Sequence, residues 1–310
     1  MPEPIRDRPD VLVLGVGGTL GEAWMRGLLS GLESAGGIDF RECEYFVGSS
    51  AGSIVAATLA AGRRPNAGDR AAREWGEAAP GEAAEPGRLG RALRGAGRFG
   101  VAAASPFAPV ALAGVAPAGR ALRAAALAAA PSTSRSLGGL SRRLDSLGAR
   151  FDGRLRVAAV DRRSGRRVMF GATGAPPASV SAAVLASCSV PWIFAPVTIG
   201  GREYVDGGVW SPTNLDAAPA GRGSSVLCLV PTASLQAART PAGALRAFTS
   251  TTVATEALAV RSRGARVRTV APDPRSAGVM GIDLMNPRRA EDVLDAAFAQ
   301  GRALAAPSGL

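Results

Sequence analysis

Two successive units of an apolar strand, a glycine turn and a helix occupy the first 62 residues of the chain. Val11–Leu14 is a continuous apolar run that ends at a glycine, which is typical of a strand buried on both faces of a parallel sheet. Helical spacing follows over Glu22–Ala35, then a short strand at Tyr45–Val47 and a helix over Ala51–Ala61. Strands that alternate with helices require a sheet whose faces the helices cover. The sequence therefore predicts the α/β class with a mostly parallel sheet.

The rest of the chain continues this alternation and adds antiparallel pairs. Ser164-Gly165 and Gly200-Gly201 each separate two short apolar runs, a pattern that indicates β-hairpins. The apolar run Pro191–Val197 is predicted to be extended. The remaining predicted strands are Leu155–Asp161, Arg167–Phe170, Val197–Ile199, Arg202–Val205, Val226–Val230 and Ala265–Ala271, and the remaining predicted helices are Leu137–Leu147, Val180–Ser187, Ala242–Ser262 and Arg288–Leu304.

One stretch interrupts an otherwise uniform chain. The 310 residues suffice for one large domain with a buried core, and we interpret residues 1–310 as a single domain. Residues 80–136 are rich in alanine, glycine, proline and arginine, which marks an insertion over the sheet. Within it, Ala121–Ala130 is predicted to be helical, as is Asp69–Ala78 before it. We interpret the insertion as a lid or a membrane-facing flap.

A serine lies at the centre of a turn that suits a nucleophile. Gly48-Ser49-Ser50-Ala51-Gly52 has the form G-x-S-x-G, and it follows an apolar strand and opens a helix. A serine hydroxyl needs a base, usually histidine and in some enzymes lysine, and the chain contains neither. If Ser50 is a nucleophile, its base is therefore a carboxylate. The alternative is a glycine-rich strand–helix turn in which the serine only caps the helix.

The glycine-rich loop Gly15–Gly21 follows the first predicted strand and has two interpretations. It could be a dinucleotide fingerprint, whose glycines let a pyrophosphate approach a helix N-terminus. It could equally be an oxyanion hole, whose N–H groups stabilise developing negative charge. The fingerprint needs an acidic residue about 20 positions on. Asp39 lies near that distance, but it precedes the strand that leads to Ser50.

A carboxylate with two following glycines is the third candidate group. Asp206-Gly207-Gly208 comes directly after a predicted hairpin strand. Glycines at these positions leave the carboxylate sterically open, as a general base requires. An ordinary Asp-Gly turn has the same appearance, so the pattern alone leaves both interpretations open.

The three motifs together resemble the patatin-like phospholipase family. Its signature is a glycine-rich loop, a G-x-S-x-G turn and a distant D-G-G or D-G-A, and here they occur in that order. The resemblance covers about residues 11–62 and 150–300. Further stretches that look familial are Val55-Ala56-Ala57, Ala186-Ser187-Cys188-Ser189-Val190-Pro191 and Gly281-Ile282-Asp283-Leu284-Met285-Asn286-Pro287.

The resemblance implies a three-layer α/β/α fold and a serine–aspartate dyad that hydrolyses acyl esters of phospholipids or other lipids without a cofactor. Ser50 would be the nucleophile and Asp206 the base. The N–H groups of Gly17 and Gly18 would bind the oxyanion. Gly48 and Gly52 would form the nucleophile elbow.

Two positions depart from the family loop, which usually reads G-G-G-x-[RK]-G. Val16 replaces a glycine, and Leu20 replaces the basic residue. Valine keeps an N–H group but restricts the backbone, and leucine removes a positive charge. The alternative is therefore a catalytically weak or inactive member that binds lipid or regulates a partner.

The net charge and its distribution indicate which classes of binding partner the protein could have. The net charge is +11, and Arg88–Arg167 holds 16 arginines against three aspartates. Such a stretch attracts anionic surfaces, so peripheral contact with an anionic membrane is one expectation and solvated arginine the other. No basic motif interleaved with aromatics indicates nucleic acid. Nor is a nicotinamide-dependent reductase favoured, since that activity would need the glycine loop to be a dinucleotide site.

The cysteines and the N-terminus bear on the compartment. Cys43, Cys188 and Cys228 have no framework spacing, and the first ten residues lack an apolar signal core. We expect a cytoplasmic protein, in part peripheral to the inner face of the membrane. The uncharged run Phe99–Gly119 is too rich in proline and glycine for a membrane span. Without histidine, no metal site is expected. The sequence does not indicate an oligomeric state.

Overall fold

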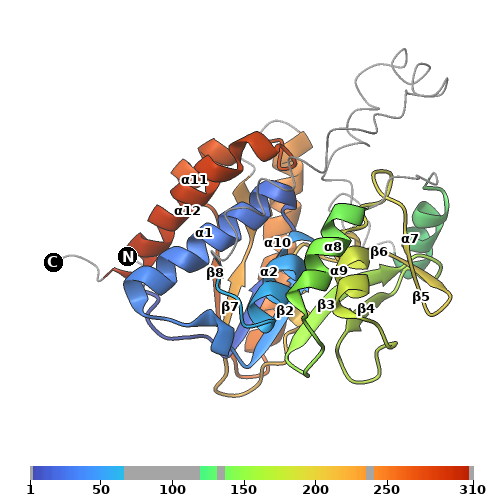
Figure 1. Cartoon of the computed structure of the whole chain (residues 1–310), viewed down its shortest axis with the longest axis horizontal. Coiled ribbons are helices and arrows are strands. Elements are labelled where there is room, and N and C mark those ends of the chain that lie inside the picture. The colour runs from blue at the N-terminus through green and yellow to red at the C-terminus, as the bar shows by residue number, and fades with distance from the viewer. Residues whose placement is uncertain (1–2, 66–118, 131–136, 235–240, 307–310) are drawn as a thin grey trace, which may run out of the picture.

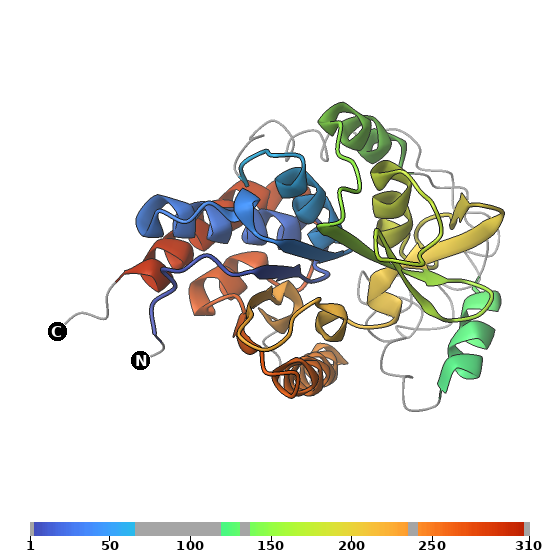
Figure 2. The same ribbon diagram turned by 90° about the horizontal axis from the view of Figure 1, so that it is seen from below.

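The structure, a computed structural model, describes residues 3–65, 119–130, 137–234 and 241–306. A central sheet separates two layers of helices, as the two orthogonal views show (Figures 1 and 2). The predicted three-layer α/β/α fold with a mostly parallel sheet is thereby confirmed.

The sheet has eight strands in the order β5-β6-β3-β2-β1-β7-β8, and β4 pairs with β3 off this path. Neighbours from β3 to β8 along this order are parallel, whereas β4, β5 and β6 are antiparallel to their partners. The strands are β1 (Val11–Leu14), β2 (Tyr45–Ser49), β3 (Leu155–Asp161), β4 (Arg167–Phe170), β5 (Val197–Ile199), β6 (Arg202–Asp206), β7 (Ser225–Leu229) and β8 (Arg266–Val270).

Alternation of side chains along β1 divides the core into two parts. Leu12 and Leu14 face a large cluster built with helices α1, α2, α8, α9 and α12, whereas Val11 and Val13 face a smaller cluster built with α10. The two faces of one buried strand thus carry both halves of the core. The helices are α1 (Gly18–Gly36), α2 (Ala51–Ala60), α7 (Gly119–Ala128), α8 (Gly138–Leu147), α9 (Val180–Cys188), α10 (Pro241–Arg261), α11 (Pro274–Met280) and α12 (Ala290–Ala305).

Helix α1 is the best-anchored helix of its layer. It packs along α12, and glycines on both helices let their backbones approach. A Cβ atom at Gly31 would lie 2.2 Å from the carbonyl oxygen of Phe298, and one at Gly301 would lie 2.2 Å from that of Leu28. Helix α1 begins directly after the glycine loop, so this packing also holds the loop in place.

Two segments differ from the sequence prediction. Pro191–Val197 is predicted to be extended, but its first four residues form a tight turn in which the Phe194 N–H donates to the Val190 carbonyl and Trp192 has φ of 68°, and only Val197 belongs to a strand. Helix α11 was not predicted, although Asp273 caps it and Pro274 opens it. The proposed helix Asp69–Ala78 and most of the insertion lie outside the described residues.

The described part of the insertion packs on the sheet. Leu127 of α7 is fully buried against Val160, Val205 and Val209, on the face that α10 also covers (Figure 2). Arg123 of the same helix is buried and lies 4.5 Å from the centre of the Trp210 ring.

Candidate active site

Ser50 lies on a strained turn between β2 and α2. Its backbone has φ of 51° and ψ of −124°, a conformation that residues other than glycine rarely adopt. Nucleophile elbows require such a strained turn. The flanking glycines are needed because backbone crowds both positions. A Cβ atom at Gly48 would lie 2.5 Å from the Ser53 Cα, and one at Gly52 would lie 2.0 Å from the Leu14 carbonyl oxygen. The elbow is therefore a steric consequence of two close backbone contacts.

Asp206 reaches the same level of the sheet from another strand. Strand β3 lies between β2 and β6, pairing Ala158 with Ser49 and Ala159 with Asp206. Asp206 thus lies one residue further along the strands than Ser49. Ser50 is also one residue beyond Ser49, so Asp206 and Ser50 lie at the same level. Gly207 then turns the chain closely over β3, since a Cβ atom there would lie 2.4 Å from the Ala158 carbonyl oxygen.

The Asp206 carboxyl group is buried and only half satisfied. Its Oδ1 accepts the Gly208 N–H at 2.7 Å, whereas its buried Oδ2 receives no well-formed hydrogen bond from the residues that the structure describes. Burial raises its pKa to about 7, and the Ser50 hydroxyl and the Gly208 N–H lower that pKa in part. The structure therefore brings Ser50 and Asp206 together, with a carboxylate oxygen left to accept a proton.

The glycine loop presents unpaired N–H groups beside Ser50. Gly17, Gly18 and Thr19 line the same pocket as Ser50, and within the described residues their N–H groups make no hydrogen bond. These are first-turn donors of α1, where the helix dipole favours negative charge. Gly18 needs to be glycine, because its φ is 59° and a Cβ atom would lie 2.7 Å from the Met285 Sδ.

The two departures in this loop have different consequences. The Val16 N–H donates to the Pro212 carbonyl at 2.9 Å, so the N–H group expected to survive there is already used. Leu20 is fully buried in the large core cluster, and its N–H donates to the Leu284 carbonyl. The N–H groups that remain as candidate oxyanion donors are therefore those of Gly17 and Gly18, together with Thr19.

The pocket is narrow, with a volume of about 40 Å³. Its walls are mostly apolar, as expected of a site that excludes water from a carboxylate. Ile193 and Phe194 line it, whereas their neighbour Trp192 packs against the cluster around Leu127, to which Val205 also belongs. The remaining lining residues are Val16, Glu22, Ala51, Ile54, Leu137, Cys188, Val190, Thr232, Leu284 and Met285.

An ion pair borders this pocket. Glu22 of α1 is almost fully buried and lies 2.8 Å from the Arg143 guanidinium of α8. The Cys188 thiol also lines the pocket. Burial and the charge of Asp206 raise its pKa well above the usual value. Because thiols react as thiolates, this raised pKa disfavours Cys188 as a nucleophile and leaves Ser50 as the candidate.

Helix α9 and its exit hold both candidate catalytic residues by their backbones. The Ser187 hydroxyl accepts the Ser50 N–H at 2.9 Å, and the Ser189 carbonyl accepts the Asp206 N–H at 3.0 Å. Sequence reasoning noted this Ser-Cys-Ser run as familial but gave it no role. The only feature of the sequence that could have indicated this supporting role is the occurrence of small polar residues at the end of a buried helix.

The dinucleotide interpretation finds no support at the glycine loop. Asp39 precedes β2, at the opposite end of the strands, where it caps a short 3-10 helix and forms an ion pair with Arg41. In the described part of the chain, no group of three cysteine, aspartate or glutamate side chains could hold a metal ion.

Comparison with known proteins identifies the family. Residues 12–219, more than half of the chain, match the family described as patatin-like phospholipase. The chain therefore belongs to the patatin-like phospholipase family, whose general activity is the hydrolysis of lipid acyl esters. The resemblance seen in the three motifs is confirmed.

Other comparisons add less. A search of curated proteins gave no match. Among solved structures, VipD from Legionella pneumophila is similar with a TM-score of 0.41 and 14% identity, over 96% of this chain and 67% of VipD. Among the helices that the structure describes, none is both long and apolar enough to cross a membrane.

Proposed function

We propose that this protein is a serine-dependent lipid acyl-ester hydrolase in which Asp206 acts directly on Ser50. The observation that supports it most is the buried Oδ2 of Asp206, which has no well-formed hydrogen bond among the described residues and lies in the same pocket as Ser50, whose hydroxyl is close enough to lower the Asp206 pKa. A carboxylate with a pKa near 7 is a competent base at neutral pH, unlike a solvated aspartate.

In the proposed first step, Asp206 accepts the Ser50 proton as Oγ attacks the ester carbonyl carbon. The carbonyl oxygen becomes an oxyanion and receives hydrogen bonds from the N–H groups of Gly17 and Gly18, each worth roughly 2.7–4 kcal/mol in related sites. Asp206 then returns the proton to the leaving alcohol. The products are an acyl ester on Ser50 and the free alcohol.

In the second step, Asp206 takes a proton from a water molecule that attacks the acyl ester. The fatty acid leaves as the proton returns to the Ser50 Oγ. No other base is required, which agrees with a chain that lacks histidine and lysine.

The test combines two substitutions and a label. Ser50→Ala and Asp206→Asn should each reduce release of p-nitrophenol from acyl esters by at least about a thousandfold. A fluorophosphonate probe should label the wild type at Ser50. Ser262→Ala, which removes an exposed serine hydroxyl just after α10, should retain labelling at Ser50.

Two results would refute the dyad. One is esterase activity that survives either substitution in folded protein. The other is a wild type that binds lipid but is neither labelled nor active, which would favour the inactive, regulatory alternative.

A further inference from the structure

A single buried amide contacts the chain neighbours of both candidate catalytic residues. The Asn214 Nδ2 donates to the Ser49 hydroxyl at 2.9 Å and lies 3.3 Å from the Gly207 carbonyl oxygen. Ser49 directly precedes Ser50, and Gly207 directly follows Asp206. Asn214 has no solvent exposure, so these contacts do not compete with water.

The orientation of this amide is set by the groups around it. The Nδ2 atom faces oxygen acceptors, including the Ser211 carbonyl at 3.1 Å, whereas Oδ1 faces the Arg167 guanidinium at 3.2 Å. Reversing the amide would place donor against donor and acceptor against acceptor. Asn214 also has φ of 53°, which asparagine tolerates better than most residues.

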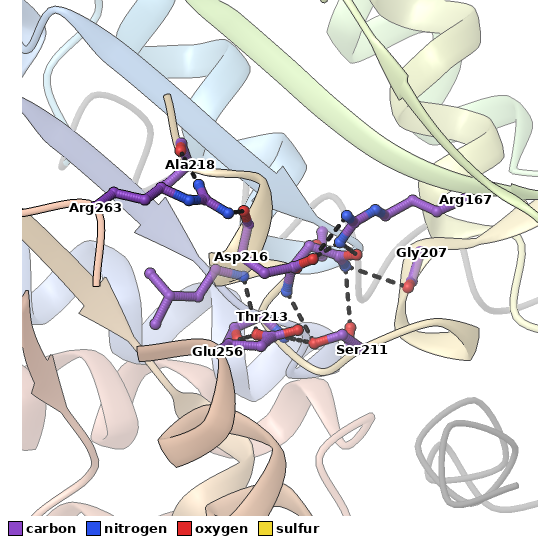
Figure 3. A network of polar contacts seen from close by, with 11 residues as sticks. Arg167, Gly207, Ser211, Thr213, Asp216, Ala218, Glu256 and Arg263 are labelled. Atoms are coloured by element: carbon purple, nitrogen blue, oxygen red, sulfur yellow. Dashed lines mark hydrogen bonds and ion pairs between the residues drawn. The ribbon is translucent and has the colours of Figure 1, made fainter. Parts of the chain in front are cut away.

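The segment that carries Asn214 is tied to helix α10 and to strand β4, as the network of contacts in Figure 3 shows. On the α10 side, the Glu256 carboxylate accepts from the Thr213 hydroxyl at 2.7 Å and from the Leu215 N–H at 3.0 Å. On the β4 side, Arg167 binds Asp216 through two nitrogens at 2.5 and 2.8 Å. Two-point contact with a carboxylate fixes the guanidinium plane, and with it the nitrogen that faces Asn214.

The ends of this segment are held as well. The Ser211 hydroxyl accepts from the N–H groups of Thr213 and Asn214, which closes a turn. Arg263 of the loop after α10 donates to the Asp216 and Ala218 carbonyls at 2.9 and 3.4 Å. A segment fixed at so many points is a rigid support rather than a passive connection.

We propose that Asn214 is a positioning residue that sets the separation of Ser50 and Asp206 by linking Ser49 to Gly207. The proposal rests on the hydrolase function above. In a dyad without an imidazole, one side chain must reach the other directly. A displacement of about 1 Å costs on the order of a hundredfold in rate.

Three variants and one control test this role. Asn214→Gly removes the amide and tolerates the positive φ, Asn214→Asp keeps the shape but loses both donors, and Ser49→Ala removes the acceptor. Ser225→Ala is the control, because its hydroxyl bonds to Asp10 at the opposite edge of the sheet. Each is measured for kcat and KM on a short p-nitrophenyl ester, for the rate of fluorophosphonate labelling, and for thermal unfolding.

We expect kcat and the labelling rate to fall together by about tenfold to a hundredfold in the three variants, with KM within about twofold. Combining Ser49→Ala with Asn214→Gly should cost little more than either change, because both remove one contact. Ser225→Ala should leave both rates unchanged.

Folded Asn214 variants with wild-type kcat and labelling rate overturn the positioning role, whatever happens to their stability. If neither Asn214 variant folds, the smaller change Ser49→Ala decides by the same two rates. A wild type that is not labelled at Ser50 removes the proposed function itself, whereas a labelled wild type with undiminished variants removes only this inference.

Discussion

At the scale of single residues, the most unusual group is a carboxylate buried without a cation. The pKa of Asp206 is raised by burial, and no positive charge counters that effect. A carboxylate paired with arginine, such as Asp216, instead has its pKa lowered. Ionising Asp206 in the folded protein is therefore costly, and the ionised form is the one that the proposed mechanism needs as a base.

This cost predicts how stability changes with pH. A raised pKa means that the unfolded chain ionises first, so folded stability due to Asp206 is lost as pH rises from about 4 to about 7. At pH 8, the free energy of unfolding of Asp206→Asn should thus exceed that of the wild type by roughly 2–4 kcal/mol. The variant should therefore unfold at a higher temperature. At pH 4 the two proteins should nearly coincide.

The measurement is thermal unfolding of both proteins across that pH range. Asp216→Asn is the contrasting change, because it removes the ion pair with Arg167 and should destabilise the protein at neutral pH. A difference between wild type and Asp206→Asn that is independent of pH would show that Asp206 is not buried in its ionised form.

The candidate dyad could be predicted from the sequence, whereas its supports could not. G-x-S-x-G and D-G-G are each ambiguous alone, but their order in the chain indicates the family, and their glycines are fixed because backbone crowds the Cβ positions of Gly48, Gly52 and Gly207. Asn214 and Ser187 carry no such pattern. Their roles depend on hydrogen bonds to residues more than a hundred positions away, and only the register of the sheet creates those contacts.

At the scale of elements, the elbow joins β2 to α2 where β1 passes closely. The glycines that this close approach requires also explain why strands β1 and β2 and the helices that follow them could be predicted from the sequence. Short apolar runs bounded by glycine have few alternative structures. The turn that opens the segment Pro191–Val197 had no such boundary, and its Ile193 and Phe194 line the pocket rather than a strand.

The elbow yields a prediction about glycine. Gly52→Ala should destabilise the protein by about 3 kcal/mol or more and abolish labelling of Ser50, because its Cβ atom would lie 2.0 Å from backbone that cannot retreat. Gly278→Ala is the matched control, since nothing lies within 4 Å of its Cβ position in the exposed part of α11. It should stabilise by roughly 0.5–1 kcal/mol.

Chemical denaturation of both variants checks this expectation. Equal and small effects would mean that the approach of α2 to β1 is loose. That result would also contradict the argument that a strained turn makes Ser50 reactive.

At the scale of the whole molecule, part of the basic character is already paired with carboxylates of the same chain. Within Arg88–Arg167, four described arginines form such ion pairs, and those of Arg154 and Arg162 are partly exposed. They are Arg143, Arg154, Arg162 and Arg167. Arg123 is buried against Trp210. Charge alone is therefore a poor guide to how this protein would meet a lipid surface.

Apolar exposure at the pocket is a more specific guide. Among the described residues, two large apolar side chains are strongly exposed, Ile282 at 68% and Leu258 at 64%. Ile282 lies two residues before Leu284, which lines the pocket with Met285. Leu258 lies on α10, which covers the other face of the sheet. Of these two described side chains, only Ile282 lies close in sequence to the pocket wall, so we expect Ile282 rather than Leu258 to enter a lipid surface that the pocket faces.

The two exposed residues form a matched pair for experiment. Ile282→Ser should lower hydrolysis of esters presented in vesicles about threefold to tenfold, because burying such a side chain contributes about 1.5–3 kcal/mol at most. Hydrolysis of a dissolved short-chain ester should not change, since the chemistry at Ser50 is untouched. Leu258→Ser should change neither rate. Equal losses from both variants on vesicles would mean that the protein meets lipid without using the rim of its pocket.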